Sequence, residues 1–431
     1  MHGFQILMKT NAMVPTTVLC LAAGVMSVYS ADWSGYRGSN NDGVSTEKFN
    51  WPAGGPKVVW KAPTKTGFSC FAINGGKVFT QMIRDVDGTP REICLALDAQ
   101  TGKELWFADV AAGKFDGSGN AGTPDNKGGD GPRSTPTVSD GKVYVFTPDL
   151  VLHCLDAANG KQIWRKSLLQ DHAGRNIGWN SAASAVVDGD LVFVAGGGAG
   201  QSLLGINKNT GEVVWKAHDE KITHATPVVA TILGTKQVIF FLQSGLLAVS
   251  AKDGKALWRF PFRYNVSTAI SPIVSGDIVY CSAGYGVGGG ACRITKSGEE
   301  FSVTELYKVQ GDKQIANHWS TPFAKDGYLY GMFSFKDYGK GPMKCVDIAT
   351  GQVKWTQPGF GAGNAILVGD KIVALADDGQ VVIVEPTPTA YKEIGRFKAI
   401  EGKCWTTPAF SDGRIYVRSV TEGACLDVSG K

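Results

Sequence analysis

The residues with the most varied chemistry occupy one recurring position, three residues before the Pro of a repeated Ser/Thr-Pro segment or before the residue that replaces this Pro. At that position stand Phe68, Arg133, Ser181, His224, Ala269, Trp319, Ala362 and Trp405, and the residue before adds Asn180, Thr268 and His318. Guanidinium and imidazole groups bind anions or exchange protons, and indole rings stack on flat rings. Equivalent positions of successive repeats form a column, and a column with such varied side chains is typical of a pocket with convergent polar groups. We predict a ligand site formed by Phe68, Arg133, Asn180, His224, Thr268, His318, Trp319 and Trp405.

The acids near this set limit its chemistry. Only Glu401 and Asp171 lie close by in the sequence, so a carboxylate pair of the glycosidase type is not indicated. His224 or His318 could act as a base, although a single His in a channel more often only forms a hydrogen bond. The set favours binding of a planar, sugar-like or anionic ligand. The alternative is that these side chains only fill a channel.

Other motifs point to turns rather than to sites. No Cys/His cluster has zinc spacing, and no metal site is predicted. The glycine-rich stretches from Gly196 and Gly284 do not open a helix, so each is interpreted as a long hairpin. The segment from Asp85 is too short for a calcium loop and is also predicted to be a hairpin. The insertion from Ala111 to Gly131 is either a lid or an irregular loop.

Two landmarks recur along the chain and must position the candidate residues. The first is Ser/Thr-Pro, an apolar stretch, a DG or GD turn and a β-rich run, as in STPTVSDGKVYVF from Ser134; counting less regular versions, it occurs eight times. The second passes through a turn to a Trp, as in LDAANGKQIW from Leu155. Because DG, NG and TG favour tight hairpin turns, each unit is predicted to be four strands.

Radial repetition of such units predicts an all-β fold, an eight-bladed β-propeller of four-stranded blades. The eighth unit stops after its third strand, and the run KVVW ending at Trp60 supplies the missing fourth. We predict that this N-terminal strand completes the last blade, because pairing the two ends of the ring removes two free strand edges. The alternative, an open solenoid, would need polar capping repeats.

The tryptophans of the second landmark are predicted to be structural. Each ring would pack against the adjacent blade, with its indole N–H bound to a backbone carbonyl. These docking residues are Trp60, Trp106, Trp164, Trp215, Trp258 and Trp355. Another column holds only small side chains, which indicates a crowded, buried position; its members are Cys154, Cys345, Cys425, Ala96, Gly205 and Ala248. Cys281 and Cys292 flank a glycine-rich hairpin and are the best disulfide candidates.

The N-terminus has the features of an export signal. Lys9 supplies a positive charge, an apolar run follows, and small residues precede Ala31. We expect residues 1–30 to be a signal peptide cleaved near Ser30, and residues 31–431 to be one exported domain in the periplasm or outside the cell.

Composition limits the partners of this domain. The formal net charge is +4 with both signs scattered, so nucleic-acid binding is not indicated. No later segment is apolar enough to span a membrane. Cys20 follows Leu19 rather than a small residue, which argues against lipid attachment.

The motif A/L-x-D-x-x-T/N-G-x-x-x-W, as in Ala96 to Trp106, resembles the tryptophan-docking repeat of the pyrroloquinoline quinone (PQQ)-like propellers, over roughly Asp32 to Lys431. The resemblance implies the closed eight-bladed ring of quinoprotein alcohol dehydrogenases and BamB-type outer-membrane assembly scaffolds. For the dehydrogenases it further implies a quinone stacked on a disulfide of adjacent cysteines, a calcium held by Glu, Asn and Asp, and a catalytic Asp. No Cys-Cys pair occurs in this sequence.

The predicted function is therefore that of a monomeric ligand-binding or protein-interaction scaffold. Its partner would be a small molecule, a glycan, or a periplasmic or cell-envelope protein, and no cofactor is predicted. The alternative is a quinoprotein-like oxidoreductase of the PQQ-dependent dehydrogenase type, with PQQ and Ca²⁺, or another carbohydrate-active enzyme using the central funnel.

Overall fold

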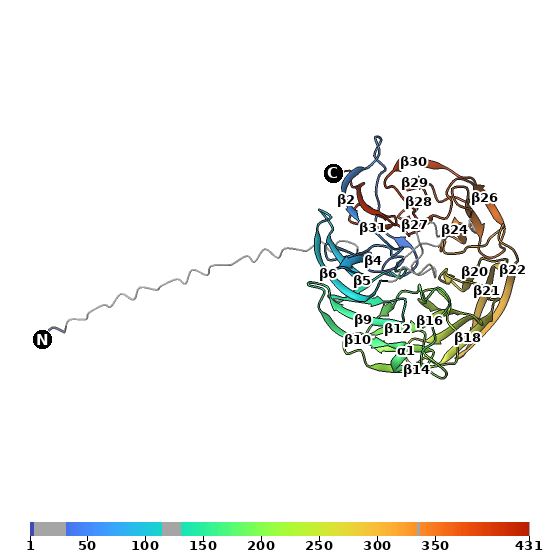
Figure 1. The fold of residues 1–431 in the computed structure, drawn as a ribbon, viewed down its shortest axis with the longest axis horizontal. Coiled ribbons are helices and arrows are strands. Elements are labelled where there is room, and N and C mark those ends of the chain that lie inside the picture. The colour runs from blue at the N-terminus through green and yellow to red at the C-terminus, as the bar shows by residue number, and fades with distance from the viewer. Residues whose placement is uncertain (4–31, 114–130, 334–336, 431) are drawn as a thin grey trace.

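The computed structural model describes residues 1–3, 32–113, 131–333 and 337–430. Its strands form eight sheets arranged as blades around a central axis (Figure 1). Within each blade, consecutive strands pair in antiparallel hairpins, and of the described strands only the first two in the chain join blades made of strands far away in the sequence. The predicted all-β, eight-bladed propeller of four-stranded blades is confirmed.

The strands of each blade are bounded as follows. Blades 1 to 4 consist of β3 (Ala72–Asn74), β4 (Lys77–Val86), β5 (Thr89–Asp98) and β6 (Glu104–Ala112); β7 (Thr137–Ser139), β8 (Lys142–Phe146), β9 (Val151–Asp156) and β10 (Gln162–Ser167); β11 (Val186–Asp188), β12 (Leu191–Ala195), β13 (Leu203–Asn207) and β14 (Val213–Ala217); and β15 (Val228–Ile232), β16 (Thr235–Leu242), β17 (Gly245–Ser250) and β18 (Ala256–Pro261). Blades 5 to 8 consist of β19 (Ile273–Ser275), β20 (Ile278–Ala283), β21 (Gly288–Ser297) and β22 (Glu300–Val309); β23 (Phe323–Lys325), β24 (Tyr328–Met332), β25 (Met343–Asp347) and β26 (Val353–Gln357); β27 (Asn364–Val368), β28 (Lys371–Leu375), β29 (Gln380–Val384) and β30 (Glu393–Lys398), with β1 (Val44–Ser45) beside β27; and β31 (Ala409–Ser411), β32 (Arg414–Arg418), β33 (Glu422–Asp427) and β2 (Lys57–Pro63). The short helix α1 (Leu168–Asp171) follows β10.

Strand β2 closes the ring, as predicted. It pairs antiparallel with β33, with Trp60 opposite Cys425, and Figure 1 shows β2 beside the C-terminal end of the chain. Arg418 reinforces this seam from within. Its guanidinium is 1% exposed and donates to Thr80 Oγ1 and to the carbonyls of Ser69 (2.7 Å) and Thr64 (2.9 Å). The last blade is thus tied to the chain that leads into blade 1.

The docking tryptophans join each blade to the next. Their indole N–H groups donate to backbone carbonyls across the seam, in the pairs Trp60 to Ala99 (3.0 Å), Trp106 to Ala157 (3.2 Å), Trp164 to Lys208 (3.1 Å), Trp215 to Ala251 (3.0 Å) and Trp355 to Thr387 (2.8 Å). Trp258 differs, because it donates to Gln237 Oε1 within its own blade (2.5 Å). The ladder places each ring opposite the small-residue column, as Trp106 lies opposite Ala96 and Trp164 opposite Cys154. The crowded, buried column is confirmed.

Two blades lack a docking Trp and use substitutes. In blade 5, Tyr307 holds the position and donates to the carbonyl of Ile348 (3.1 Å). In blade 7 the position is Gly395, and a Cβ there would lie 2.3 Å from Nε1 of Trp51. The loop before β2 therefore supplies the ring that β30 does not carry, and Gly395 leaves room for it.

The Ser/Thr of the first landmark link the blades near the axis. The side chain of one blade accepts the backbone N–H of the preceding blade, and we call this ring of contacts the belt. Its bonds are Cys70 N to Thr135 Oγ1 (3.0 Å), Thr135 N to Ser184 Oγ (2.8 Å), Ser184 N to Thr226 Oγ1 (2.9 Å), Ser271 N to Thr321 Oγ1 (3.2 Å) and Thr407 N to Cys70 Sγ (3.2 Å). The belt gives the repeated Ser/Thr a structural reason that the sequence pattern alone did not supply.

The segment before β2 crosses one end of the central channel. Trp33 bridges Ile73 of blade 1, the buried Arg37 donates to the carbonyls of Thr321 (2.5 Å) and Pro322 (2.8 Å) before blade 6, and β1 runs parallel to β27 of blade 7. Because these blades lie on different sides of the axis, the segment forms a floor.

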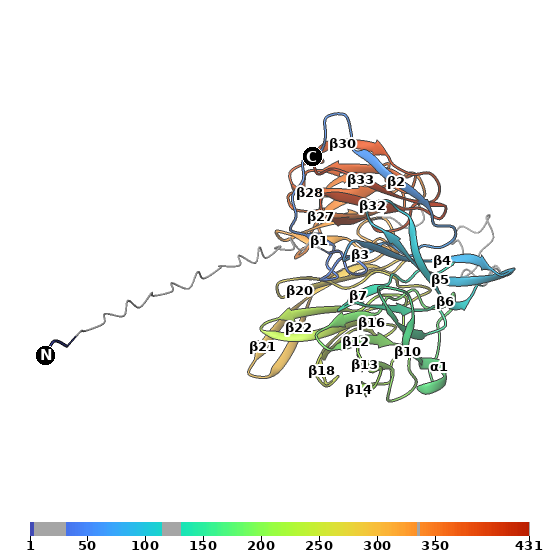
Figure 2. The same cartoon turned by 90° about the vertical axis from the view of Figure 1, so that its left-hand side faces the viewer.

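The cysteine and hairpin predictions had different outcomes. All eight cysteines of the described residues are free and buried. The proposed Cys281–Cys292 disulfide is wrong: in the β20–β21 ladder Cys281 lies opposite Gly290 and Cys292 opposite Val279, so the two thiols are offset along the strands. The stretches from Gly196, Gly284 and Asp85 do lie in hairpins, and Figure 2 shows the β4–β5 hairpin reaching beyond its neighbours.

Two predictions, the signal peptide and the long insertion, concern segments that the structure describes only in small part. The signal peptide lies outside the described residues, as does most of the insertion from Ala111 to Gly131. Within the described ranges, no helix is long and apolar enough to cross a membrane.

Candidate functional site

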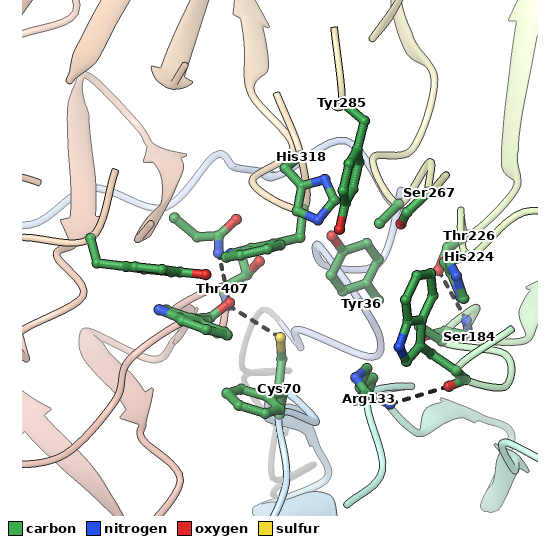
Figure 3. A pocket seen from close by; sticks show the side chains of 18 residues that line it. Tyr36, Cys70, Arg133, Ser184, His224, Thr226, Ser267, Tyr285, His318 and Thr407 are labelled. Atoms are coloured by element: carbon green, nitrogen blue, oxygen red, sulfur yellow. Dashed lines mark hydrogen bonds between the residues drawn. The ribbon is translucent and has the colours of Figure 1, made fainter. Parts of the chain in front are cut away.

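A cavity of about 400 Å³ lies on the propeller axis, where the segments that precede the first strands converge. Its lining residues, drawn in Figure 3, are Tyr36, Phe68, Cys70, Arg133, Trp179, Ala182, Ser184, His224, Thr226, Ser267, Ala269, Tyr285, His318, Trp319, Tyr338, Asn364, Trp405 and Thr407. A cavity of this size falls within the range that binds small molecules in other proteins.

Most of the predicted site residues meet in this cavity. Phe68, Arg133, His224, His318, Trp319 and Trp405 all line it. Asn180 and Thr268 do not, but both hold His224. The Thr268 carbonyl accepts the His224 backbone N–H (2.9 Å), and the Asn180 backbone is hydrogen-bonded to the imidazole. That these residues bind a ligand stays a prediction.

One position of the sequence column needs correction. Blade 3 lacks the Pro that marks the column, and its first strand begins at Val186, as that of blade 2 begins at Thr137. The residue equivalent to Arg133 is therefore Ala182, which lines the cavity, and not Ser181. The missing Pro caused the one-residue error.

Several lining residues were missed by sequence reasoning. Tyr36 comes from the channel floor, Trp179 from the loop before β11, Tyr285 from the β20–β21 turn and Tyr338 from the β24–β25 connection. Figure 3 shows Tyr36 extending into the same cavity as His318 and Arg133. These segments differ in length between blades, so no repeat column contained them. The belt residues Ser184 and Thr226 could have been found, because the Ser/Thr landmark was visible.

One side of the cavity is a packed aromatic wall, which we define as Phe68, Trp319, Tyr338 and Trp405. Trp405 stacks on Phe68 with ring centroids 5.3 Å apart and on Tyr338 at 5.2 Å. Trp319 lies 4.6 Å from Trp405, and its N–H donates to the carbonyl of Ala362 (3.2 Å). The mutual contacts fix these rings before any ligand arrives.

Blades 2 and 4 contribute the basic groups. Burial, and to a lesser extent the positive charge of Arg133, lower the pKa of His224 to about 4. His224 is therefore neutral near pH 7 and acts there as a hydrogen-bonding group rather than as a strong base. Arg133 Nη1 donates to the carbonyl of Trp179 (3.5 Å), which connects this group to the loop before β11.

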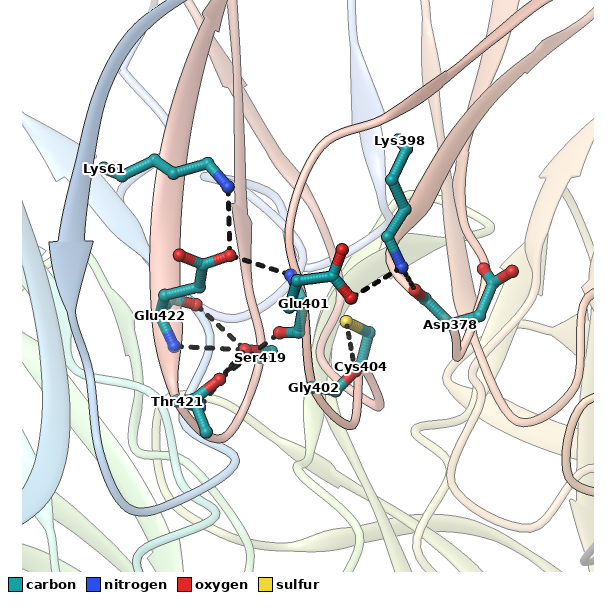
Figure 4. A network of polar contacts seen from close by, with 9 residues as sticks. All are labelled: Lys61, Asp378, Lys398, Glu401, Gly402, Cys404, Ser419, Thr421 and Glu422. Atoms are coloured by element: carbon teal, nitrogen blue, oxygen red, sulfur yellow. Dashed lines mark hydrogen bonds and ion pairs between the residues drawn. The ribbon is translucent and has the colours of Figure 1, made fainter.

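The acids lie outside the cavity. Glu401 pairs with Lys398 (3.0 Å) in a surface network that reaches Glu422 and Lys61 of the closing seam (Figure 4). Asp171 accepts the backbone N–H of Ser167 at α1 (3.0 Å). Asp377, at the mouth, accepts the N–H groups of Gly339 (2.8 Å) and Ala362 (3.1 Å). Within residues 32–113, 131–333 and 337–430, no Asp or Glu lines the cavity.

This donor set does not fit a quinoprotein centre. Calcium takes six to eight oxygen ligands, usually with carboxylates among them, and the lining residues that the structure describes offer no carboxylate. No group of three or more His, Cys, Asp or Glu among the described residues could hold a metal ion. The axial Cys70 is isolated in sequence and accepts the Thr407 N–H, so it cannot form the disulfide of adjacent cysteines.

The fold and the axial cavity place the chain among the β-propeller repeat proteins. Sequence comparison identifies the family. Residues 90–357 match the family model described as outer membrane protein assembly factor BamB, so the chain belongs to this family of PQQ-like β-propellers.

Individual relatives are distant. The chain is 25% identical to the tetrathionate hydrolase of Acidithiobacillus ferrooxidans over 65% of its own length and 49% of the relative. It is 23% identical to the outer membrane protein assembly factor BamB of Moranella endobia over 58% of its own length and 63% of the relative. The chain thus spans less than two thirds of each of these relatives.

Solved structures share the fold. BamB from Moraxella catarrhalis superposes with a TM-score of 0.59 at 17% identity, covering 86% of this chain and 97% of that one. A quinohemoprotein alcohol dehydrogenase from Pseudomonas putida gives 0.64 at 12% identity, covering 93% and 81%. At such identities the likeness concerns the fold alone.

Proposed function

We propose that the protein is a ligand-binding module whose site is the axial cavity. The observation that carries this proposal is the meeting of six predicted residues, from the segments that precede five different blades, around one cavity of about 400 Å³. A structural column repeats the same side chain in most blades, as the docking tryptophans do, whereas these positions differ from blade to blade.

The chemistry of the lining favours a flat or sugar-like ligand that carries negative charge. The aromatic wall offers ring faces and edges, and Arg133 supplies positive potential near His224. An acid-catalysed reaction is not supported, because the lining residues described by the structure include no carboxylate pair. Binding without turnover is therefore the favoured activity.

A role as a protein-interaction scaffold is the second candidate. It is supported by membership of a family described as an outer-membrane assembly factor. A periplasmic or cell-envelope protein would then bind the rim. This proposal and the ligand site are compatible, because a propeller can carry both.

The oxidoreductase alternative is supported by relatives that include a quinoprotein ethanol dehydrogenase from Pseudomonas aeruginosa, 31% identical over 31% of this chain. The cavity lining does not favour it, because the described part of that lining has no carboxylate for calcium. We further propose that residues 1–30 direct export, that residues 31–431 form one domain, and that this domain is monomeric.

The test is a titration of the purified protein with soluble glycans, small carboxylates, and PQQ with and without Ca²⁺, followed by tryptophan fluorescence and thermal unfolding. A fluorescence change and a higher melting temperature with a glycan or carboxylate, both lost in Trp405→Ala, are expected. Tight PQQ binding with redox turnover would instead establish the oxidoreductase.

A further inference from the structure

The loop before β11 holds a tryptophan in an unusual way. Trp179 and Asn180 both have left-handed backbone conformations, with φ of 62° and 56°. For a bulky side chain such a conformation is an outlier, and it persists only where the surroundings enforce it.

Hydrogen bonds on both sides of Trp179 enforce this turn. The Asn180 N–H donates to the carbonyl of Ile177 (3.0 Å). The Asn176 amide donates to the carbonyl of Pro148 (2.8 Å) and to Asn180 Oδ1 (3.2 Å). These hydrogen bonds fix the backbone of the turn and thereby the position of the Trp179 side chain.

The strain does not serve burial of the ring. Trp179 stays 47% exposed although it lines the cavity, whereas the docking Trp215 is 7% exposed. Among the described residues no ring stacks on Trp179, in contrast to Trp405 with its contacts to Phe68 and Tyr338. The cavity thus presents one large aromatic face that the fold itself does not use.

Two hydroxyl groups that line the same cavity as Trp179 indicate which functional group the ligand carries. Ser184 Oγ and Thr226 Oγ1 each accept a backbone N–H in the belt, which leaves the O–H hydrogen of each to donate into the cavity. Two hydroxyl donors close to a guanidinium suit a carboxylate.

We propose that Trp179 is the stacking platform for a flat-faced ring bearing one carboxylate, with the carboxylate bound by Ser184 and Thr226. This inference rests on the proposed ligand-binding function and specifies the ligand. A hydroxylated aromatic acid and a sugar acid share this chemistry.

The test uses two matched pairs of probes: 4-hydroxybenzoate with 4-hydroxybenzamide, and D-glucuronate with D-glucose. Calorimetric titration of the protein should give about tenfold or tighter binding of one acid than of its neutral partner. Which acid binds distinguishes the aromatic source from the sugar source.

Three variants test the platform. Trp179→Gly should weaken binding of the preferred acid about tenfold or more, as expected for loss of an aromatic stack, while Trp179→Phe should retain most of the affinity. Because glycine tolerates positive φ, Trp179→Gly should leave the melting temperature unchanged or raise it. The matched control is Leu233→Gly, since Leu233 is 46% exposed with φ of 48° in the β15–β16 turn; it should not affect binding.

Two results would overturn the inference and leave the proposed function intact: unchanged affinity in Trp179→Gly, or equal binding of an acid and its neutral partner. Failure of the wild type to bind any of the four probes would count against both the inference and the ligand-binding function.

Discussion

The tryptophans at the outer strands and those at the axis have the same side chain and opposite environments. Trp215, at the outer edge, is 7% exposed, donates to a carbonyl of the next blade and covers Gly254 of that blade's turn. Trp405, at the axis, is half-buried and contacts other aromatic side chains. The outer type recurs at regular intervals, and the axial type does not. Regular recurrence therefore marks residues that build the ring, and irregular occurrence marks residues available for a ligand.

The largest effect on stability is expected from removing the N-terminal segment, which carries the docking tryptophan of the last blade and the strand that closes the propeller. Deleting residues 32–63 removes Trp60, Trp51 and the strand that pairs with β33. We expect loss of the cooperative thermal transition, because two blades lose a docking ring and blade 8 gains a free edge. Circular dichroism during heating measures this. A truncated protein with the parent's melting temperature would refute closure by β2.

A single outer tryptophan should affect stability but not the site. Trp215→Ala leaves a cavity between blades 3 and 4 and an unpaired Ala251 carbonyl, so the free energy of unfolding should fall by about 3–5 kcal/mol. Denaturant unfolding gives the value, and Trp215→Phe, which keeps most of the ring volume, should lose less. A loss below about 1 kcal/mol would show that docking is not the main role of this ring.

The neutral His224 at the axis predicts a pH dependence. Its pKa is lowered to about 4 in the folded state and is about 6.5 when unfolded. Between these values the unfolded chain binds the extra proton, so stability should fall as the pH drops from about 6.5 to 4, by about 2–3 kcal/mol. Urea unfolding of the wild type and of His224→Asn at pH 7 and pH 4.5 isolates this contribution. An equal loss in both proteins would assign the pH dependence to other groups.

The smallest effect on stability is expected at the axial wall. Trp405→Ala removes stacking with Phe68 and Tyr338 but opens onto an existing cavity, so we expect a loss of about 1–2 kcal/mol together with loss of ligand binding. Trp215→Ala should lower the free energy of unfolding strongly and leave ligand binding intact, whereas Trp405→Ala should lower it little and abolish ligand binding. A larger loss of stability at Trp405 than at Trp215 would contradict the distinction between the two kinds of tryptophan.

Much of the molecule was predictable because the repeat is strong. The DG and TG turns and the spacing of Trp106, Trp164 and Trp215 indicate hairpins of fixed length, and hairpins of fixed length stack in only a few ways. Counting the units assigned Trp60 to the last blade, and the column before the Pro assigned Arg133 and Trp405 to the axis. The prediction was wrong by one residue only where blade 3 lacks the Pro.

The sequence by itself determined the blade count, the closure of the ring and the set of axial positions, since all of these depend on local turns and a repeated period. Only the tertiary structure decided that Tyr36 forms the floor, that Trp51 replaces a missing docking ring and that Trp179 faces the cavity unstacked. These residues lie in irregular segments, where no period constrains the chain. Their positions follow from contacts between segments far apart in sequence.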